Sequence, residues 1–83
     1  MSNKFKIAGL QMVSGLHPAE NLAAAGQLVA EAAAAGAQLA LLPEYFPIIS
    51  SNDADRFSVR EPYGSGPVQD WLAATARRHG IWL

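Results

Sequence analysis

One glutamate stands where this chain could carry out acid–base chemistry. Glu44 lies in the tetrapeptide Pro43-Glu44-Tyr45-Phe46, directly after the short apolar run 38–42. We expect this run to be a strand, and ligands bind at the carboxyl ends of strands in open α/β sheets. A carboxylate partly desolvated by a proline and two aromatic side chains would suit a general base. The alternative is a glutamate that caps a neighbouring helix or pairs with an arginine.

Other charged residues lie in the long segment 45–66. Asp53 and Asp55 could form a metal site with Glu44, which would favour a metal-dependent α/β phosphotransfer domain. Three carboxylates without a fixed spacing predict solvated loop residues more readily than metal ligands, so we expect no metal. Arg56 and Arg60 could bind a substrate carboxylate or form an ion pair with Glu61, and we expect the ion pair.

The composition excludes several functions within these 83 residues. There is no cysteine, and therefore no disulfide, thiolate zinc site or cysteine nucleophile in this stretch. The net charge of -1 argues against a nucleic-acid or anionic-membrane surface. Charged residues make up 16% of the chain, against about 25% in typical soluble domains. We infer that more chain or another subunit covers part of the surface.

The spacing of apolar residues predicts the order strand, helix, strand, loop, helix, strand. Strands are expected at 5–12, 38–42 and 81–83, with both faces of the first strand apolar and buried. The first helix begins at Pro18 and ends near Gly36, and the second runs from Pro67 to Gly80. Alternating strands and helices predict an α/β fold with a parallel or mixed sheet. No targeting segment or membrane span is visible, so we expect a cytoplasmic protein.

Five stretches of the chain together resemble the nitrilase superfamily of carbon–nitrogen hydrolases. The opening strand 6–12 and the helix that starts near Asn21-Leu22 and ends at 34–37 are similar to the first strand and helix of that family. Leu41-Leu42-Pro43-Glu44-Tyr45-Phe46 resembles its most recognisable early motif, and 66–69 and 76–81 resemble its second helix and third strand. The resemblance runs in order over essentially the whole chain.

The resemblance implies an αββα four-layer sandwich, of which this chain would be the N-terminal β-α-β-α-β portion. It also implies hydrolysis of a non-peptide carbon–nitrogen bond, in an amide or nitrile of a small acid, by a Glu-Lys-Cys set. Glu44 then matches the general base, while Tyr45 and Phe46 either line the substrate pocket or pack in the core. We expect no cofactor, a small-molecule substrate, no nucleic-acid or membrane partner, and a homo-oligomer.

The missing cysteine is where the chain departs from the family pattern. The family's lysine and cysteine lie downstream of the third strand, and Lys4 and Lys6 match no catalytic position. We therefore expect residues 1–83 to be an incomplete part of one carbon–nitrogen hydrolase domain, inactive by itself. The alternative from another class is a non-catalytic α/β interaction module, which the low charge content and an exposed apolar edge would suit.

Overall fold

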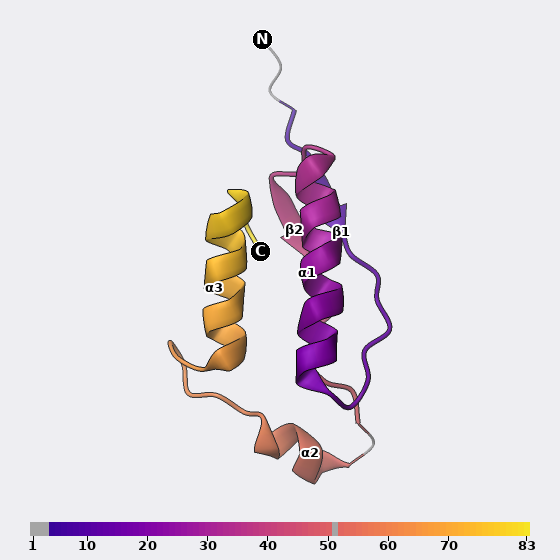
Figure 1. The fold of residues 1–83 in the computed structure, drawn as a ribbon, viewed down its shortest axis with the longest axis vertical. Coiled ribbons are helices and arrows are strands. Elements are labelled where there is room, and N and C mark those ends of the chain that lie inside the picture. Colours follow the sequence, from indigo (N-terminus) through magenta and orange to yellow (C-terminus); the bar gives the residue numbers. More distant parts are fainter. Residues whose placement is uncertain (1–3, 51) are drawn as a thin grey trace.

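The computed structural model describes residues 4–50 and 52–83, apart from the side chains of Asp53 and Arg56. Its elements follow the order β1 (Ile7–Gly9), α1 (Pro18–Ala34), β2 (Leu39–Leu41), α2 (Asp53–Ser58) and α3 (Pro67–His79). In Figure 1, α1 lies over β1 and β2, and α3 runs alongside α1. The fold is therefore α/β, as the sequence predicts.

The strands form a small parallel sheet with β2 in its centre. β1 pairs with β2 in the register Ile7 to Leu39 and Gly9 to Leu41. On the other side of β2, Trp82 forms a single parallel bridge with Leu39. Its carbonyl accepts a hydrogen bond of 2.8 Å from the N–H of Ala40. The strand predicted at 81–83 is thus reduced to one bridge, and the strand predicted at 5–12 to three paired residues.

The first long helix has the limits that its local signals predict. Pro18 occupies its first turn, where a missing N–H costs no hydrogen bond. After Ala34 the chain turns through Gly36, whose φ of 91° favours glycine. The side chain of Lys6 also reaches this end, where its Nζ donates a hydrogen bond of 2.7 Å to the carbonyl of Ala35. Lys6 therefore bonds to one of the free carbonyl groups at the end of α1.

The core lies between one face of the sheet and α1. It consists of Val29, Ala40 and Ile81, with partly buried residues packed against it, namely Ala8, Leu10, Ala37 and Leu83. The buried positions of α1 are mostly small, which allows the helix to approach the sheet closely.

The opposite face of the sheet carries exposed apolar side chains, contrary to the expected burial of both faces of the first strand. Phe5, Ile7 and Leu41 are exposed, and Trp82 is 74% exposed. Alternation along the strands places these side chains opposite Ala8 and Ala40. The described helices α1 and α3 lie side by side and cover only one face of the sheet.

The segment predicted as a long loop contains a short helix, α2. Before it, the side chain of Asn52 accepts a hydrogen bond of 2.9 Å from the N–H of Ala54. Asp55 accepts another, of 2.6 Å, from the hydroxyl of Ser50. The Asn52 bond is of the kind that starts helices, because the side chain accepts from a free backbone N–H of the first turn. Because α2 has only six residues, its apolar positions give no helical period.

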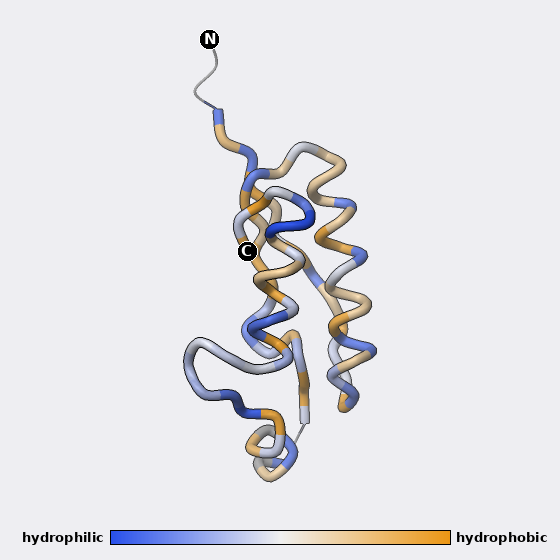
Figure 2. The backbone as a smooth tube through the Cα atoms, turned by 60° about the vertical axis from the view of Figure 1, so that its left-hand side comes forward, coloured by the Kyte–Doolittle hydropathy of each residue, from blue (hydrophilic) through white to orange (hydrophobic). Residues whose placement is uncertain are grey.

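The last helix, α3, begins at Pro67 and ends before Gly80, as predicted. Gly80 adopts a left-handed conformation with a φ of 61°. The last turn of α3 contains Arg77, Arg78 and His79, which suit the negative end of the helix dipole. Figure 2 shows a strongly hydrophilic stretch near the C-terminus of the chain. No residue of α3 is fully buried, and Trp71 and Leu72 are partly buried.

Candidate active site

Glu44 lies in a tight turn directly after the central strand. The N–H of Phe46 donates a hydrogen bond of 3.0 Å to the carbonyl of Pro43, which closes the turn. At the end of β2, the carbonyl of Leu41 accepts a bond of 2.9 Å from Leu10. Glu44 and Tyr45 are the two central residues of the turn, and both side chains are exposed.

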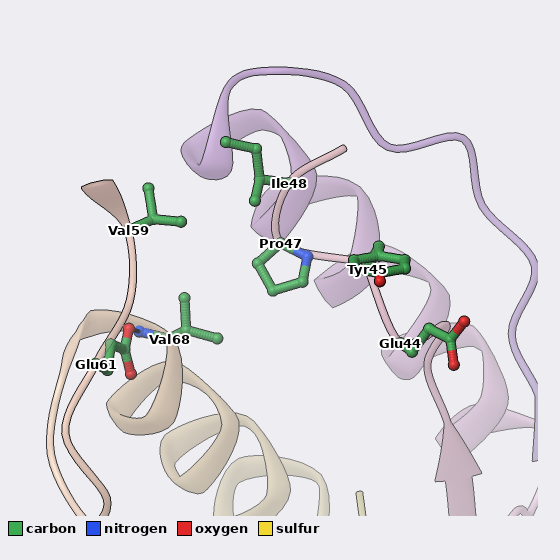
Figure 3. A pocket seen from close by; sticks show the side chains of 7 residues that line it. All are labelled: Glu44, Tyr45, Pro47, Ile48, Val59, Glu61 and Val68. Atoms are coloured by element: carbon green, nitrogen blue, oxygen red, sulfur yellow. Dashed lines mark hydrogen bonds between the residues drawn. The ribbon is translucent and has the colours of Figure 1, made fainter. Parts of the chain in front are cut away.

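The side chain of Glu44 is exposed to solvent. Figure 3 shows its carboxylate pointing away from Glu61 and Val68. The expectation of a partly desolvated carboxylate is therefore wrong for this structure. The turn carries Glu44 past the last paired residue of β2, and the described elements leave it uncovered.

An open pocket of about 300 Å³ lies beside the turn. Figure 3 shows residues of the turn and of the segment directly after it on one side, and Val59, Glu61 and Val68 on the other. Its lining is mostly apolar and includes two carboxylates, with the residues Glu44, Tyr45, Pro47, Ile48, Val59, Glu61 and Val68. A pocket of this kind would take an apolar or amphipathic small molecule.

Tyr45 and Phe46 have different surroundings. The sequence left open whether these two residues line a pocket or pack in the core, and each alternative describes one of them. Tyr45 is exposed and lines the open pocket. Phe46 is buried, and its ring packs on Trp71 of α3 with centroids 6.0 Å apart and planes inclined by 40°. Phe46 also lines a second open pocket of about 280 Å³, together with Glu44. Phe46 thus anchors the turn to α3 while remaining next to Glu44.

Glu61 is a pocket residue whose role the sequence reasoning missed. Its carboxylate accepts hydrogen bonds from the N–H of Val68 at 2.6 Å and from the N–H of Gln69 at 3.0 Å. The side chain of Gln69 donates a further bond of 3.0 Å. Partial burial would raise the pKa of Glu61, but these hydrogen bonds outweigh that effect and lower the pKa below its ordinary value.

The sequence contained one signal for this role, because Glu61 lies a few residues before Pro67, where a helix is predicted to begin. We expected Glu61 to form an ion pair with an arginine, but the structure shows other contacts for both Glu61 and Arg60. Glu61 binds the start of α3, and the guanidinium of Arg60 lies 5.2 Å from the centre of the Phe57 ring. The side chain of Arg56 lies outside the described residues.

Asp55, one of the two aspartates considered with Glu44 as metal ligands, bonds to a different residue. Among the described residues, no group of three or more His, Cys, Asp or Glu side chains could hold a metal ion. Asp55 accepts its bond from Ser50, and the side chain of Asp53 lies outside the described part of the chain.

No helix within the described ranges has the length and apolar character needed to cross a membrane.

The fold and the site define an α/β unit that presents a carboxylate at the carboxyl end of a central parallel strand. The chain belongs to the carbon-nitrogen hydrolase family, which it matches over residues 6–83. It is 39% identical over 77 residues to the deaminated glutathione amidase of Mus musculus. The corresponding proteins of Rattus norvegicus and Homo sapiens are 38% and 36% identical.

These alignments include most of this chain but only a part of each relative. The match to the mouse protein includes 93% of this chain and 24% of the relative. The chain therefore spans about a quarter of the length of the curated relatives it matches. The predicted membership of the nitrilase superfamily is confirmed.

Proposed function

We propose that this chain is the N-terminal part of an enzyme that hydrolyses a carbon–nitrogen bond of a small molecule, with Glu44 as the general base. One observation carries the proposal. Glu44 stands in a turn at the carboxyl end of the central strand, beside an open pocket, inside the region that matches the hydrolase family. A base in this position can reach a reacting group bound at the edge of the sheet.

The proposed chemistry follows the Glu-Lys-Cys set that the family resemblance implies. Glu44 takes the proton of a cysteine thiol as the sulfur attacks the amide carbon, and returns it to the departing amine. It then takes a proton from water, which attacks the thioester and releases the acid and the thiol. A lysine stabilises the charge that develops on the substrate oxygen. Both partners would lie beyond Leu83, so the chain alone would be inactive.

The substrate that we propose is an amide of a small acid rather than a nitrile. Two observations support this choice. The relatives reported above are amidases acting on deaminated glutathione. The pocket beside Glu44 has a mostly apolar lining in which Tyr45 supplies a hydroxyl group. Such a lining would hold an acyl chain while leaving the amide end near the turn.

The exposed face of the sheet supports the four-layer αββα sandwich as the architecture of the whole protein. Phe5, Ile7, Leu41 and Trp82 place apolar side chains on that face. A second sheet packed about 10 Å away would remove them from water. The family resemblance extends the proposal to a homo-oligomer of such sandwiches.

The test is the substitution Glu44→Gln in the full-length protein. Loss of the base should lower kcat for amide hydrolysis by about 10²–10⁴-fold. The circular dichroism spectrum and unfolding midpoint should be unchanged, because Glu44 is exposed. The matched control is Glu31→Gln, at an exposed position on α1, which should retain full activity.

Two results would contradict the proposal. Full turnover by Glu44→Gln would show that another group acts as the base. A full-length protein with no amide hydrolysis at all would favour the alternative of a non-catalytic interaction module, for which the exposed sheet face is the supporting observation.

A further inference from the structure

Asn21 is the one buried polar side chain among the residues whose side chains the structure describes. It lies in the second turn of α1 and is 5% exposed. A polar group in such a position is costly unless its hydrogen bonds are satisfied. The hydrogen-bond partners of Asn21 therefore indicate which segments of the chain the residue holds in place.

The amide group of Asn21 joins two segments that are far apart in the sequence. Its Oδ1 accepts a hydrogen bond of 2.9 Å from the N–H of Gly15, and its Nδ2 donates one of 2.9 Å to the carbonyl of the same residue. The second N–H of Nδ2 donates a bond of 2.8 Å to the carbonyl of Pro47. Both donors and the oxygen are thus used.

Two further bonds fix the same pair of segments. The carbonyl of Gly15 also accepts a hydrogen bond of 3.0 Å from the N–H of Ile49. The hydroxyl of Ser14 donates one of 2.9 Å to the carbonyl of Phe46. Residues 46–49 are therefore attached to residues 14 and 15, and Asn21 is the side chain that bonds to both segments.

These hydrogen bonds restrict the position of the turn that carries Glu44. On its N-terminal side the turn follows β2, which is paired to β1. On its C-terminal side the turn continues into Phe46 and Pro47, which Ser14 and Asn21 hold. Glu44 lies between these two fixed points and has no buried side-chain anchor of its own.

We propose that Asn21 is a positioning residue for Glu44, holding the far end of its turn through the carbonyl of Pro47. The inference rests on the proposed function, in which Glu44 is the base. A displacement of about 1 Å in a catalytic group can lower the rate by ~10²-fold. Asn21 touches no substrate and acts only through the backbone that carries Glu44.

The test is Asn21→Asp in the full-length protein. Aspartate has nearly the same shape but lacks the two N–H donors, so the carbonyls of Gly15 and Pro47 both lose the bond that Asn21 donates to them. We expect kcat for amide hydrolysis to fall by about 10–100-fold, and KM to change by less than kcat, because the substitution removes no side chain of the pocket lining. The matched control is Gln27→Glu, the same amide-to-acid change at an exposed position of α1, which should leave kcat unchanged.

Amide hydrogen exchange separates positioning from a general loss of structure. In Asn21→Asp the N–H groups of Phe46 and Ile49 should exchange faster, while that of Ala40, bonded to Trp82, should keep its protection. If Asn21→Asp does not fold, Ser14→Ala removes a neighbouring bond, to Phe46, and should give a smaller loss of kcat with the same pattern of exchange.

The inference is overturned if a folded Asn21→Asp protein keeps its wild-type kcat, or if exchange at Phe46 is unchanged. It is also overturned if kcat falls only in proportion to the unfolded fraction. These results differ from failure of the proposed function, in which Glu44→Gln stays fully active. In that case the exchange at Phe46 alone decides whether Asn21 holds the turn.

Discussion

The carboxylate of Glu61 accepts a hydrogen bond of 2.6 Å from the backbone N–H of Val68, in the first turn of α3. The residue before the helix is Gly66, which has no side chain to cap it. A glutamate from the preceding segment therefore takes over this role. Gln69 completes the arrangement, because its Oε1 accepts a bond of 2.7 Å from the N–H of Gly64. The loop between Glu61 and α3 depends on the charged form of Glu61.

The stability of this region should depend on pH through Glu61. Its pKa is lowered in the folded protein, so the folded state favours the charged form. The resulting stabilisation is complete above the ordinary glutamate pKa of about 4.3 and is lost as the pH falls through the lower pKa of the folded state. Glu61→Gln should lower the urea midpoint at pH 7, and the difference from the wild type should shrink as the pH falls below the ordinary glutamate pKa.

Asp70→Asn provides the matched control for this measurement. Asp70 is an exposed acidic residue in the first turn of the same helix. It should change the urea midpoint much less than Glu61→Gln. A difference between Glu61→Gln and the wild type that stays constant from neutral to acidic pH would contradict the assignment of the capping role to the charged carboxylate.

Gly66 should tolerate no larger residue. Its φ is 135°, and a Cβ at this position would collide with the side chain of Glu61. Glu61 cannot yield without breaking its bonds to α3. Gly66→Ala should therefore lower the free energy of unfolding by about 2 kcal/mol or more. Thermal or urea unfolding measures this effect.

Gly80→Ala is the comparison that isolates the collision. Gly80 also has a positive φ, of 61°, but a Cβ there would meet no atom within 4 Å. Only the backbone cost of about 1 kcal/mol is expected. Equal losses from the two substitutions would mean that contact with Glu61 contributes nothing.

Val29 should be the most sensitive aliphatic position of the core. Its side chain is 0% exposed, between α1 and the sheet. Val29→Ala should reduce the free energy of unfolding by about 2 kcal/mol, through lost burial and the cavity that remains. Val13→Ala makes the same change at a position that is 98% exposed, and should stay within about 0.5 kcal/mol of the wild type. Similar losses of unfolding free energy at both positions would show that Val29 does not contribute to the core as proposed.

The helix limits were predictable because their signals are local. Pro18 and Pro67 start α1 and α3, and Gly36 and Gly80 follow their ends. A proline without an N–H and a glycine with positive φ act on the backbone at their own positions. The same reasoning missed α2, whose six residues are too few to show a helical period.

The extent of the strands was less predictable. Apolar residues run well beyond the paired residues of β1 and β2, but pairing needs a neighbour at the right distance. At Trp82 the neighbour is β2, and only one bridge forms. Apolar character shows which side chains favour burial, whereas the described fold decides which face is covered.

The sequence by itself determined the α/β class, the family and the place of Glu44 after a strand, because each depends on the order and type of residues along the chain. Only the tertiary structure decided the roles of Asn21, Phe46 and Glu61. Asn21 bonds to Pro47, 26 positions away, and Phe46 packs on Trp71 of α3. Glu61 binds the start of the same helix. Such partners are chosen by distances in the folded chain, which the pattern of residues along it does not contain.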